Sequence, residues 1–369
     1  MSDDFDRPAN GLQWANNDRA LYFTAQDEGY VNVFQMDLDG GVRGVTEGKH
    51  AVSLTSVAGS VGVGIGSSFY EPGDVVSYPL NGRGSLTQLT AVNADLLEGK
   101  TLGEHEEIWY EASDGNRAHG WIIKPPNFDP DKQYPLLMEI HGGPFAMYQG
   151  RFVFNYQAYA ANGFVVLYTN PRGSTGYGET FSQAINQAYP SVDYLDLMGG
   201  VDATIARGYI DEKRLYVGGC SGGGVLSSWV IGHTTRFAAA AVRCPVSNWL
   251  SMAGTTDIPF FTFSFFEKPF WEDPSDWLKH SPLMYVDKVK TPTVVMTGEL
   301  DLRTPMPQSE EYYAALKVLG VPAKLLRFND EYHGTGSKPS NNMRTMLYMM
   351  SWYNRYTLDG EVESTDQED

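Results

Sequence analysis

This sequence has few cysteines, no long apolar run and no cluster of metal-binding residues. The 369 residues include two cysteines, Cys220 and Cys244, too few for a disulfide framework. No apolar run approaches the roughly 18 residues that a membrane-spanning helix requires. The seven histidines are scattered and neither cysteine belongs to a CxxC pair, so no metal site is expected. This composition fits a soluble protein of a reducing compartment, and we expect a cytoplasmic location.

Basic charge is also scarce. Lysine and arginine number 27 against 45 acidic residues, which gives a net charge of −18. A chain this acidic is repelled by phosphate backbones and anionic membrane surfaces, so neither nucleic acid nor membrane is an expected partner. Residues 1–6 are acidic, the reverse of the basic start of a signal peptide. Six acids and no base lie in residues 359–369, and residues 358–369 are predicted to be a disordered acidic tail.

Residues 1–95 contain short strand-like runs separated by turn signals. The pattern recurs after about 40 residues, the length of a four-stranded propeller blade. For example, Leu21–Thr24 corresponds to Val61–Gly64, and Val33–Leu38 to Val75–Leu80. We expect a partial, propeller-like region of two blades; a small antiparallel sandwich is the alternative. Two blades cannot close a ring, because propellers typically need about four.

Residues 96–357 alternate strands with helices, which predicts a mostly parallel sheet covered on both faces. The order of elements is that of the α/β-hydrolase fold, a doubly wound sheet. No G-x-G-x-x-G opens the first β–α turn, so no dinucleotide and no other cofactor is expected. The expected strands are 135–140, 164–169, 214–218, 238–242, 292–297 and 323–328, and the expected helices are 152–162, 194–207, 223–232, 307–319 and 341–356.

Gly219–Gly223 matches the G-x-S-x-G pattern, with Ser221 at its centre. The match is informative because an apolar strand, 214–218, precedes it and a helical segment follows. This strand–turn–helix is typical of a nucleophile elbow, in which small residues allow a tight turn that exposes the serine. The residue at the x position, Cys220, is not central, so we expect it to be a small packed residue and not the nucleophile.

A serine hydroxyl needs a base, and this fold supplies the partners in the chain order Ser, Asp, His, on loops that follow later strands. Asp301 follows the strand at 292–297 and His333 follows the strand at 323–328. Glu299 and Asp330 are rival acids. We favour Asp301, because it lies on the turn, from which a short side chain can reach an imidazole.

His141-Gly142-Gly143-Pro144 follows the strand at 135–140. The paired glycines free the backbone to direct an N–H into the site, as in half of an oxyanion hole. We expect Gly143 to supply that donor and Gly222 the other. Each such donor typically contributes about 10²–10³ in rate. His141 is interpreted as a buried anchor of the loop.

These motifs resemble those of the prolyl oligopeptidase family of serine peptidases, and most closely its acylaminoacyl-peptidase-like branch. The resemblance covers residues 104–356 and rests on 141–144, 170–178 (NPRGSTGYG), the elbow, 298–305 and 331–334. It implies that residues 1–95 are the last portion of a β-propeller, which in that family restricts access to short peptides. Here we expect that region to be shortened to about two blades.

Between the elbow and Asp301 lies a segment dense in aromatic residues. It has two interpretations: core packing beneath a cap, or an apolar pocket for an acyl group or P1 side chain. The candidate pocket residues are Phe260, Phe263, Phe266 and Trp271.

The sequence thus predicts a serine hydrolase that cleaves short peptides or acyl-amino acids through an acyl-enzyme. A carboxylesterase acting on small apolar esters is the alternative, and a non-catalytic binding protein on the same scaffold is a third.

Two blades would leave strand edges unpaired, and such edges invite pairing with another chain. We therefore expect a homo-oligomer, most simply a two-fold dimer with contacts in residues 1–95.

Overall fold

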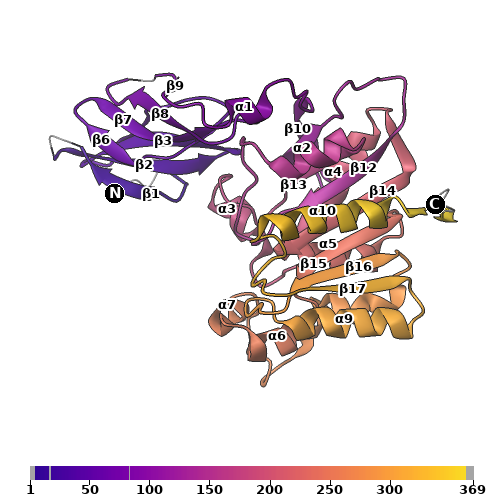
Figure 1. The fold of residues 1–369 in the computed structure, drawn as a ribbon. Helices are drawn as coiled ribbons and strands as arrows, with labels where there is room; N and C mark the ends of the chain where they lie inside the picture. Colours follow the sequence, from indigo (N-terminus) through magenta and orange to yellow (C-terminus); the bar gives the residue numbers. More distant parts are fainter. Residues whose placement is uncertain (1–4, 16–17, 83, 363–369) are drawn as a thin grey trace.

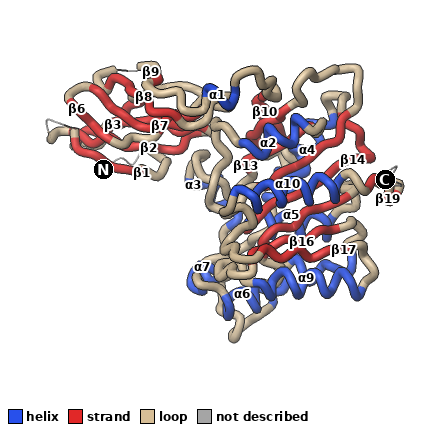
Figure 2. Tube along the Cα trace, in the orientation of Figure 1, coloured by secondary structure: helices blue, strands red, loops and turns tan. Residues whose placement is uncertain are grey.

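An all-β region and a larger α/β region make up the chain, as shown by a computed structural model that describes residues 5–15, 18–82 and 84–362. Figure 1 shows the two regions side by side, and Figure 2 shows the helices concentrated in the α/β region. None of the helices in these ranges is long and apolar enough to cross a bilayer.

The all-β region is one twisted sheet made of two similar halves. Strands β1 to β4 form an antiparallel meander in chain order, and β6 to β9 repeat it. The short strand β5 pairs with both β3 and β7 and so joins the halves into one sheet instead of a two-sheet sandwich. The strands are β1 (Asn10–Trp14), β2 (Ala20–Asp27), β3 (Tyr30–Asp37), β4 (Val42–Gly44), β5 (Ala51–Val52), β6 (Ser56–Ala58), β7 (Val61–Ser67), β8 (Asp74–Pro79) and β9 (Thr87–Gln88).

The α/β region is built on a second sheet with the strand order β10-β11-β13-β12-β14-β15-β16-β17. Strands β12 to β17 are parallel, and β10 and β11 form the antiparallel opening pair. This is the doubly wound arrangement that the alternating pattern predicted. The strands are β10 (His105–Glu111), β11 (Arg117–Ile123), β12 (Tyr134–Ile140), β13 (Val165–Asn170), β14 (Ile210–Ser221), β15 (Ala239–Pro245), β16 (Thr293–Gly298) and β17 (Ala323–Phe328).

Helices cover both faces of this sheet because successive strand residues point to opposite sides. On one face, Tyr159 and Met349 pack in the core with Tyr216; on the other, Val230 and Tyr312 pack with Val217. The first face carries α2 (Phe154–Ala161) and α10 (Pro339–Tyr353), and the second carries α4 (Asp193–Ile205), α5 (Gly222–His233) and α9 (Met306–Val318).

Several short helices were not predicted. They are α1 (Ala94–Leu97), α3 (Glu179–Ser182), α6 (Trp249–Thr255), α7 (Pro259–Phe263), α8 (Ser275–Lys279) and the 3₁₀ turns Gln183–Ile185 and Pro282–Lys288. Helices of four to seven residues are too short to show a clear amphipathic period, which explains the omission.

A turn of the all-β region fixes it to the α/β region. Glu28 and Gly29, both with positive φ, form the tight hairpin turn between β2 and β3. A Cβ at Gly29 would lie 2.5 Å from the Trp121 ring, so only glycine allows this close approach. The Gly150 N–H donates to the Gly29 carbonyl at 2.8 Å. The all-β region thereby contacts the loop that follows the predicted oxyanion residues.

The predicted disordered tail is wrong for its first residues. Strands β18 (Tyr356–Thr357) and β19 (Gly360–Glu361) pair with each other. The Leu358 N–H donates to the Lys213 carbonyl, and Asp359 forms an ion pair with Lys213. The excess of acids concealed this pairing, because the neutralising lysine is distant in sequence. Residues 363–369 lie outside the described residues.

Candidate active site

Ser221 ends β14 in a strained conformation and occupies the N-cap position of α5. Its φ of 62° and ψ of −120° are rare for a residue with a side chain. Such strain is the signature of the nucleophile elbow, where a strand turns abruptly into a helix and its serine is exposed. The local structure predicted around Ser221 is therefore present.

Close backbone approach explains the glycines around this serine. A Cβ at Gly222 would lie 2.8 Å from the Gly143 backbone nitrogen, and one at Gly223 would lie 2.1 Å from the Ile140 carbonyl oxygen. The two residues predicted to form the oxyanion hole, Gly143 and Gly222, are therefore in direct backbone contact. A Cβ at Gly142 would lie 3.9 Å from Ser221 Oγ, so the loop also passes close to the serine hydroxyl.

Two side chains hold the oxyanion loop. His141 Nδ1 donates to the Gly142 carbonyl at 2.6 Å, and its Nε2 lies 2.9 Å from Ser174 Oγ. Burial lowers the pKa of His141, which keeps the ring neutral. The anchoring role expected for His141 agrees with these contacts. On the elbow side, the hydroxyl of buried Tyr189 donates to the Gly222 carbonyl at 3.1 Å.

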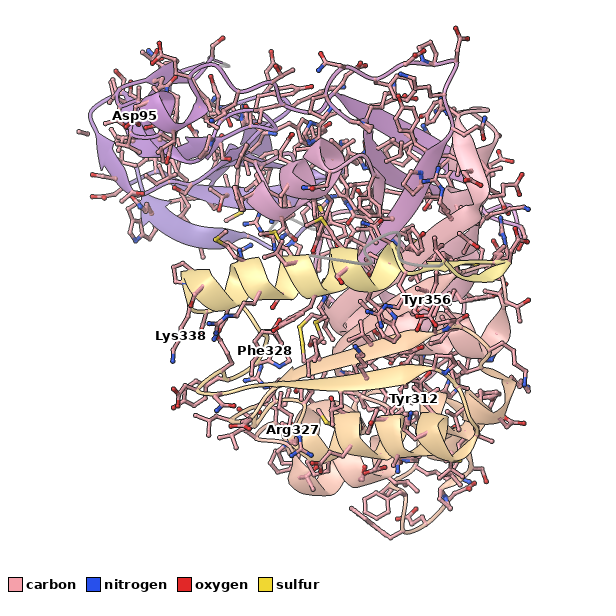
Figure 3. All side chains as sticks on the ribbon, turned by 45° about the vertical axis from the view of Figure 1, so that its right-hand side comes forward. Asp95, Tyr312, Arg327, Phe328, Lys338 and Tyr356 are labelled. Atoms are coloured by element: carbon pink, nitrogen blue, oxygen red, sulfur yellow. A yellow bond between two sulfur atoms is a disulfide. The ribbon has the colours of Figure 1, made fainter. Side chains whose placement is uncertain are left out.

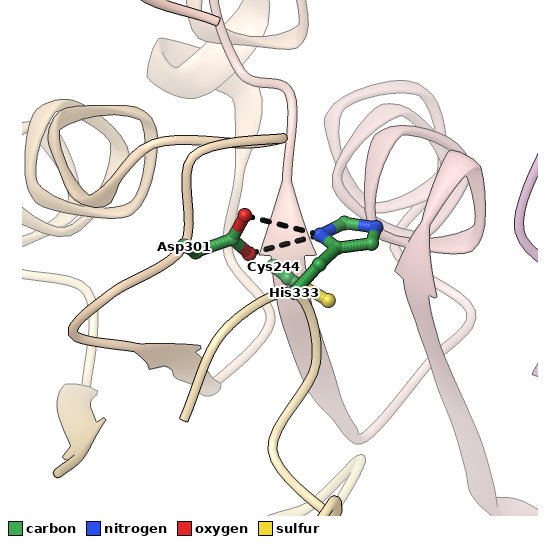
Figure 4. A group of neighbouring side chains, drawn as sticks. All are labelled: Cys244, Asp301 and His333. Carbon is green, nitrogen blue, oxygen red and sulfur yellow. Dashed lines mark hydrogen bonds and ion pairs between the residues drawn. The ribbon is translucent and has the colours of Figure 1, made fainter. Parts of the chain in front are cut away.

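Asp301 and His333 form a hydrogen-bonded pair, shown in Figure 4. His333 Nδ1 lies 2.9 and 3.2 Å from the two carboxylate oxygens of Asp301. The Asp301 side chain is buried, whereas that of His333 is 32% exposed. Within the described part of the chain no hydrogen bond joins Ser221 to His333. In free enzymes such contacts are often loose and shorten when substrate binds.

The remaining bonds to Asp301 come from its own turn. Its carboxylate accepts the N–H groups of Arg303 and Thr304, both at 2.9 Å, and the Thr304 hydroxyl at 3.1 Å. These bonds fix the carboxylate in the orientation that faces His333. Sequence analysis did not single out Thr304, although a threonine three residues after a turn aspartate is a recognisable signal for this geometry.

The rival acids lie elsewhere. Glu299 is exposed, and Asp330 is exposed and forms an ion pair with Lys338 at 3.1 Å. The neighbouring Glu331, which was not considered, is buried and accepts hydrogen bonds from Ser337, Lys338 and Asn341. Burial alone would raise its pKa, but these bonds hold the pKa below its usual range. Glu331 therefore anchors the loop that carries His333.

Three of the four predicted pocket residues, Phe263, Phe266 and Trp271, belong to one aromatic cluster with Trp277, and their role as an acyl pocket stays a prediction. Phe260 and Trp271 are 89% and 67% exposed, whereas Phe266 is buried against Trp277 with ring centroids 4.4 Å apart. Phe263 packs between these groups, 5.5 Å from Trp271. The segment consists of short helices joined by loops, so some of its side chains point into the core and others point to the solvent.

A different aromatic pair lies beside the oxyanion loop. Phe145, two residues after Gly143, stacks on Phe265 with ring centroids 6.1 Å apart. Phe265 is buried and also contacts Tyr189 and Trp249. Phe145 is 40% exposed and so offers an apolar surface near the serine. Sequence analysis missed this pair because its two members lie 120 residues apart.

The two cysteines are joined, contrary to the expectation that Cys220 is only a small packed residue. A disulfide links Cys220, directly before Ser221, to Cys244 near the end of β15 (Figure 3). Their Cα atoms are 5.3 Å apart because β14 and β15 are neighbouring parallel strands. The Cys244 sulfur also lies close to the Asp301–His333 pair, within 4.8 Å of a carboxylate oxygen and a ring nitrogen.

The doubly wound sheet, the strained serine at the end of β14 and the Asp–His pair beyond β16 and β17 define an α/β hydrolase of the serine type. The model of the prolyl oligopeptidase family matches residues 151–359, and the chain belongs to that family.

Known proteins are similar to almost the whole chain. An uncharacterized peptidase of Bacillus subtilis, YuxL, is 34% identical over 349 residues, which is 93% of this chain and 53% of YuxL. An acylaminoacyl peptidase of Pyrococcus horikoshii aligns with a TM-score of 0.88 at 26% identity, covering 99% of this chain and 58% of that one. A second structure, of an acylaminoacyl peptidase in complex with Z-Gly-Gly-Phe-chloromethyl ketone, aligns with the same TM-score at 27% identity and the same coverage. The chain thus spans little more than half the length of these proteins.

Proposed function

We propose that this chain hydrolyses short peptides or acyl-amino acids through an acyl-enzyme on Ser221. The observation that carries the proposal is the Asp301–His333 hydrogen bond at 2.9 Å together with a strained elbow serine, in a member of a peptidase family. The similar acylaminoacyl peptidase in complex with a blocked peptide ending in phenylalanine supports an acylated peptide as the substrate class.

Each group has one task in this mechanism. His333 takes the proton of Ser221 through Nε2, while Asp301 holds the proton on Nδ1 and so selects the tautomer that can act as base. The serine oxygen attacks the substrate carbonyl, and the N–H groups of Gly143 and Gly222 stabilise the resulting oxyanion. His333 then gives its proton to the leaving amine. Water repeats the sequence on the acyl-enzyme. We expect no cofactor to take part.

A comparison of amide and ester turnover on one acyl group tests the proposal against the carboxylesterase alternative. Using an N-acetyl-phenylalanine anilide and the matching ethyl ester, we expect hydrolysis of both, with acylation limiting for the anilide. Covalent labelling of wild type, but not Ser221→Ala, by a fluorophosphonate checks that the serine is reactive. Ester cleavage without measurable anilide cleavage would favour the esterase, and failure of both labelling and cleavage would favour a binding protein.

The same substrates test the acyl pocket. If Phe145 contacts the acyl group, Phe145→Ala should reduce the preference for a phenylalanyl over an alanyl acyl group by about tenfold, because a hydrophobic contact of this size is worth 1–3 kcal/mol. The control is Phe260→Ala, which removes a ring that is 89% exposed. The relevant measurement is the ratio of kcat/KM for the two acyl groups. Equal ratios in wild type and Phe145→Ala would place the pocket elsewhere.

We also propose that the protein is a homo-oligomer located in the cytoplasm. The low number of cysteines supports the location, whereas the Cys220–Cys244 disulfide counts against it, because disulfides are rare in cytosolic proteins. Supporting the oligomer, β1 and β9 form the two ends of the all-β sheet, and Leu12 and Trp14 on β1 are more than half exposed.

Light scattering at micromolar concentration should give at least twice the chain mass of 40.9 kDa. Trp14→Lys, which adds charge to the β1 edge, should shift the particle towards monomer. Val318→Lys, which alters an even more exposed apolar residue at the end of α9, should not. A wild-type mass of one chain would contradict the proposal.

A further inference from the structure

The disulfide places a potential metal ligand beside the Asp–His pair. Cys244 is buried at the end of β15, and its sulfur lies close to the His333 side chain (Figure 4). In the disulfide this sulfur has no charge to offer a metal ion. Reduction would leave a thiol among a carboxylate and an imidazole, which is a ligand set that zinc prefers.

We propose that Cys244, Asp301 and His333 form an inhibitory zinc site that exists only when the Cys220–Cys244 disulfide is reduced. One candidate ligand atom from each residue lies within 4.8 Å of the other two. Tetrahedral zinc with Zn–S near 2.3 Å and Zn–N or Zn–O near 2.0–2.1 Å requires ligand separations of about 3.3–3.6 Å. Small side-chain rotations therefore suffice. Water can fill the fourth position, because the His333 side chain is partly exposed.

The site forms in two steps, reduction of the disulfide and binding of zinc. A dithiol reductant transfers two electrons and two protons to the disulfide, which gives the thiols of Cys220 and Cys244 and leaves the reductant as a disulfide. Zinc then displaces one proton from the Cys244 thiol, because the thiolate is the ligand.

Zinc at this position would stop the reaction through the tautomer of His333. The ring nitrogen that faces Asp301 is Nδ1, so an ion shared by these residues takes the Nδ1 lone pair. A neutral imidazole carries one proton, which must then reside on Nε2. Nε2 could no longer accept the proton of Ser221. The oxyanion residues are not part of the site, so zinc should lower kcat and leave KM nearly unchanged.

The test compares oxidised and reduced protein. Wild type is reduced with a trialkylphosphine, which becomes the phosphine oxide with oxygen from water, and is desalted under inert gas. With zinc at tens of micromolar, we expect reduced protein to lose at least tenfold in kcat and to recover with EDTA. Oxidised protein should lose less than twofold, and magnesium should have no effect on either.

Two cysteine variants separate the ligand from the disulfide. Cys220→Ser breaks the disulfide and leaves Cys244 free, so zinc should inhibit it without any reductant. Cys244→Ser breaks the same disulfide but removes the ligand, so it should resist zinc in both states. Each variant is compared with its own activity without zinc. Because both lose the disulfide, a difference between them cannot come from its loss.

Zinc binding is also measured directly, because inhibition rests on the proposed function and binding does not. After gel filtration, three samples should retain one zinc per chain: reduced wild type, Cys220→Ser and the reduced, inactive variant Ser221→Ala. Oxidised wild type and Cys244→Ser should retain no zinc. Equal binding by Cys220→Ser and Cys244→Ser, or equal inhibition of oxidised and reduced wild type, would overturn the proposal. If reduced wild type retained zinc as expected but cleaved no substrate in the absence of zinc, the proposed function alone would be overturned.

Discussion

Ser221→Ala should lower the turnover of an acylated peptide by about 10⁴–10⁶, which is the largest effect we expect from one substitution. The hydroxyl is the attacking group, and the neighbouring sulfur of Cys220 is held in the disulfide. His333→Ala should have almost the same effect. Asp301→Ala should cost less, because Asp301 orients the base and does not itself carry the transferred proton.

Double variants make this prediction sharper. The three side chains act as one unit, so the losses of Ser221→Ala and His333→Ala should not add. Ser60→Ala, an exposed serine in the turn between β6 and β7, is the control and should keep wild-type turnover. Single-turnover measurement with a chromogenic ester separates chemistry from product release. Turnover of Ser221→Ala within a hundredfold of wild type would mean that another group is the nucleophile.

Arg243→Met should lower the free energy of unfolding by about 3–5 kcal/mol, because it leaves the Glu139 carboxylate buried without its partner. The Glu139 and Arg243 side chains are 2% and 15% exposed, and their ion pair joins β12 to β15 across β14. The two side chains can meet over β14 because Gly218 on that strand has no side chain; a Cβ there would lie 3.2 Å from Glu139 Oε1. Urea unfolding followed by tryptophan fluorescence measures the loss.

Replacing both partners tests whether the loss comes from the unpaired charge. Within the described residues, Glu139 Oε1 and Arg243 Nε have no hydrogen-bond partner, so the pair is incompletely satisfied. The double variant Glu139→Met with Arg243→Met should therefore recover most of the stability. The exposed pair Arg327–Glu310 is the control, and Arg327→Met should cost less than about 1 kcal/mol. A similar cost for Arg243→Met and Arg327→Met would show that burial does not matter here.

Local patterns were sufficient for the fold class and for the position of the elbow. An apolar strand, a run of small residues and a helix are adjacent in sequence, so this strand–turn–helix can be recognised from neighbouring residues alone. The loops of Asp301 and His333 were also accessible, because the carboxyl ends of parallel strands meet at one edge of a sheet. The choice of Asp301 over Glu299 and Asp330 followed from turn geometry alone.

The sequence by itself determined the order of strands and helices, the strand–turn–helix around Ser221 and the loops that reach it. Tertiary structure alone decided which distant residues meet: Cys220 with Cys244, Phe145 with Phe265, and Glu139 with Arg243. It also decided that Asp359 binds Lys213 and that Phe266 belongs to the core. The physical reason is that periodicity and turn residues act over a few positions. Side-chain pairing instead depends on which strands become neighbours once the sheet has formed.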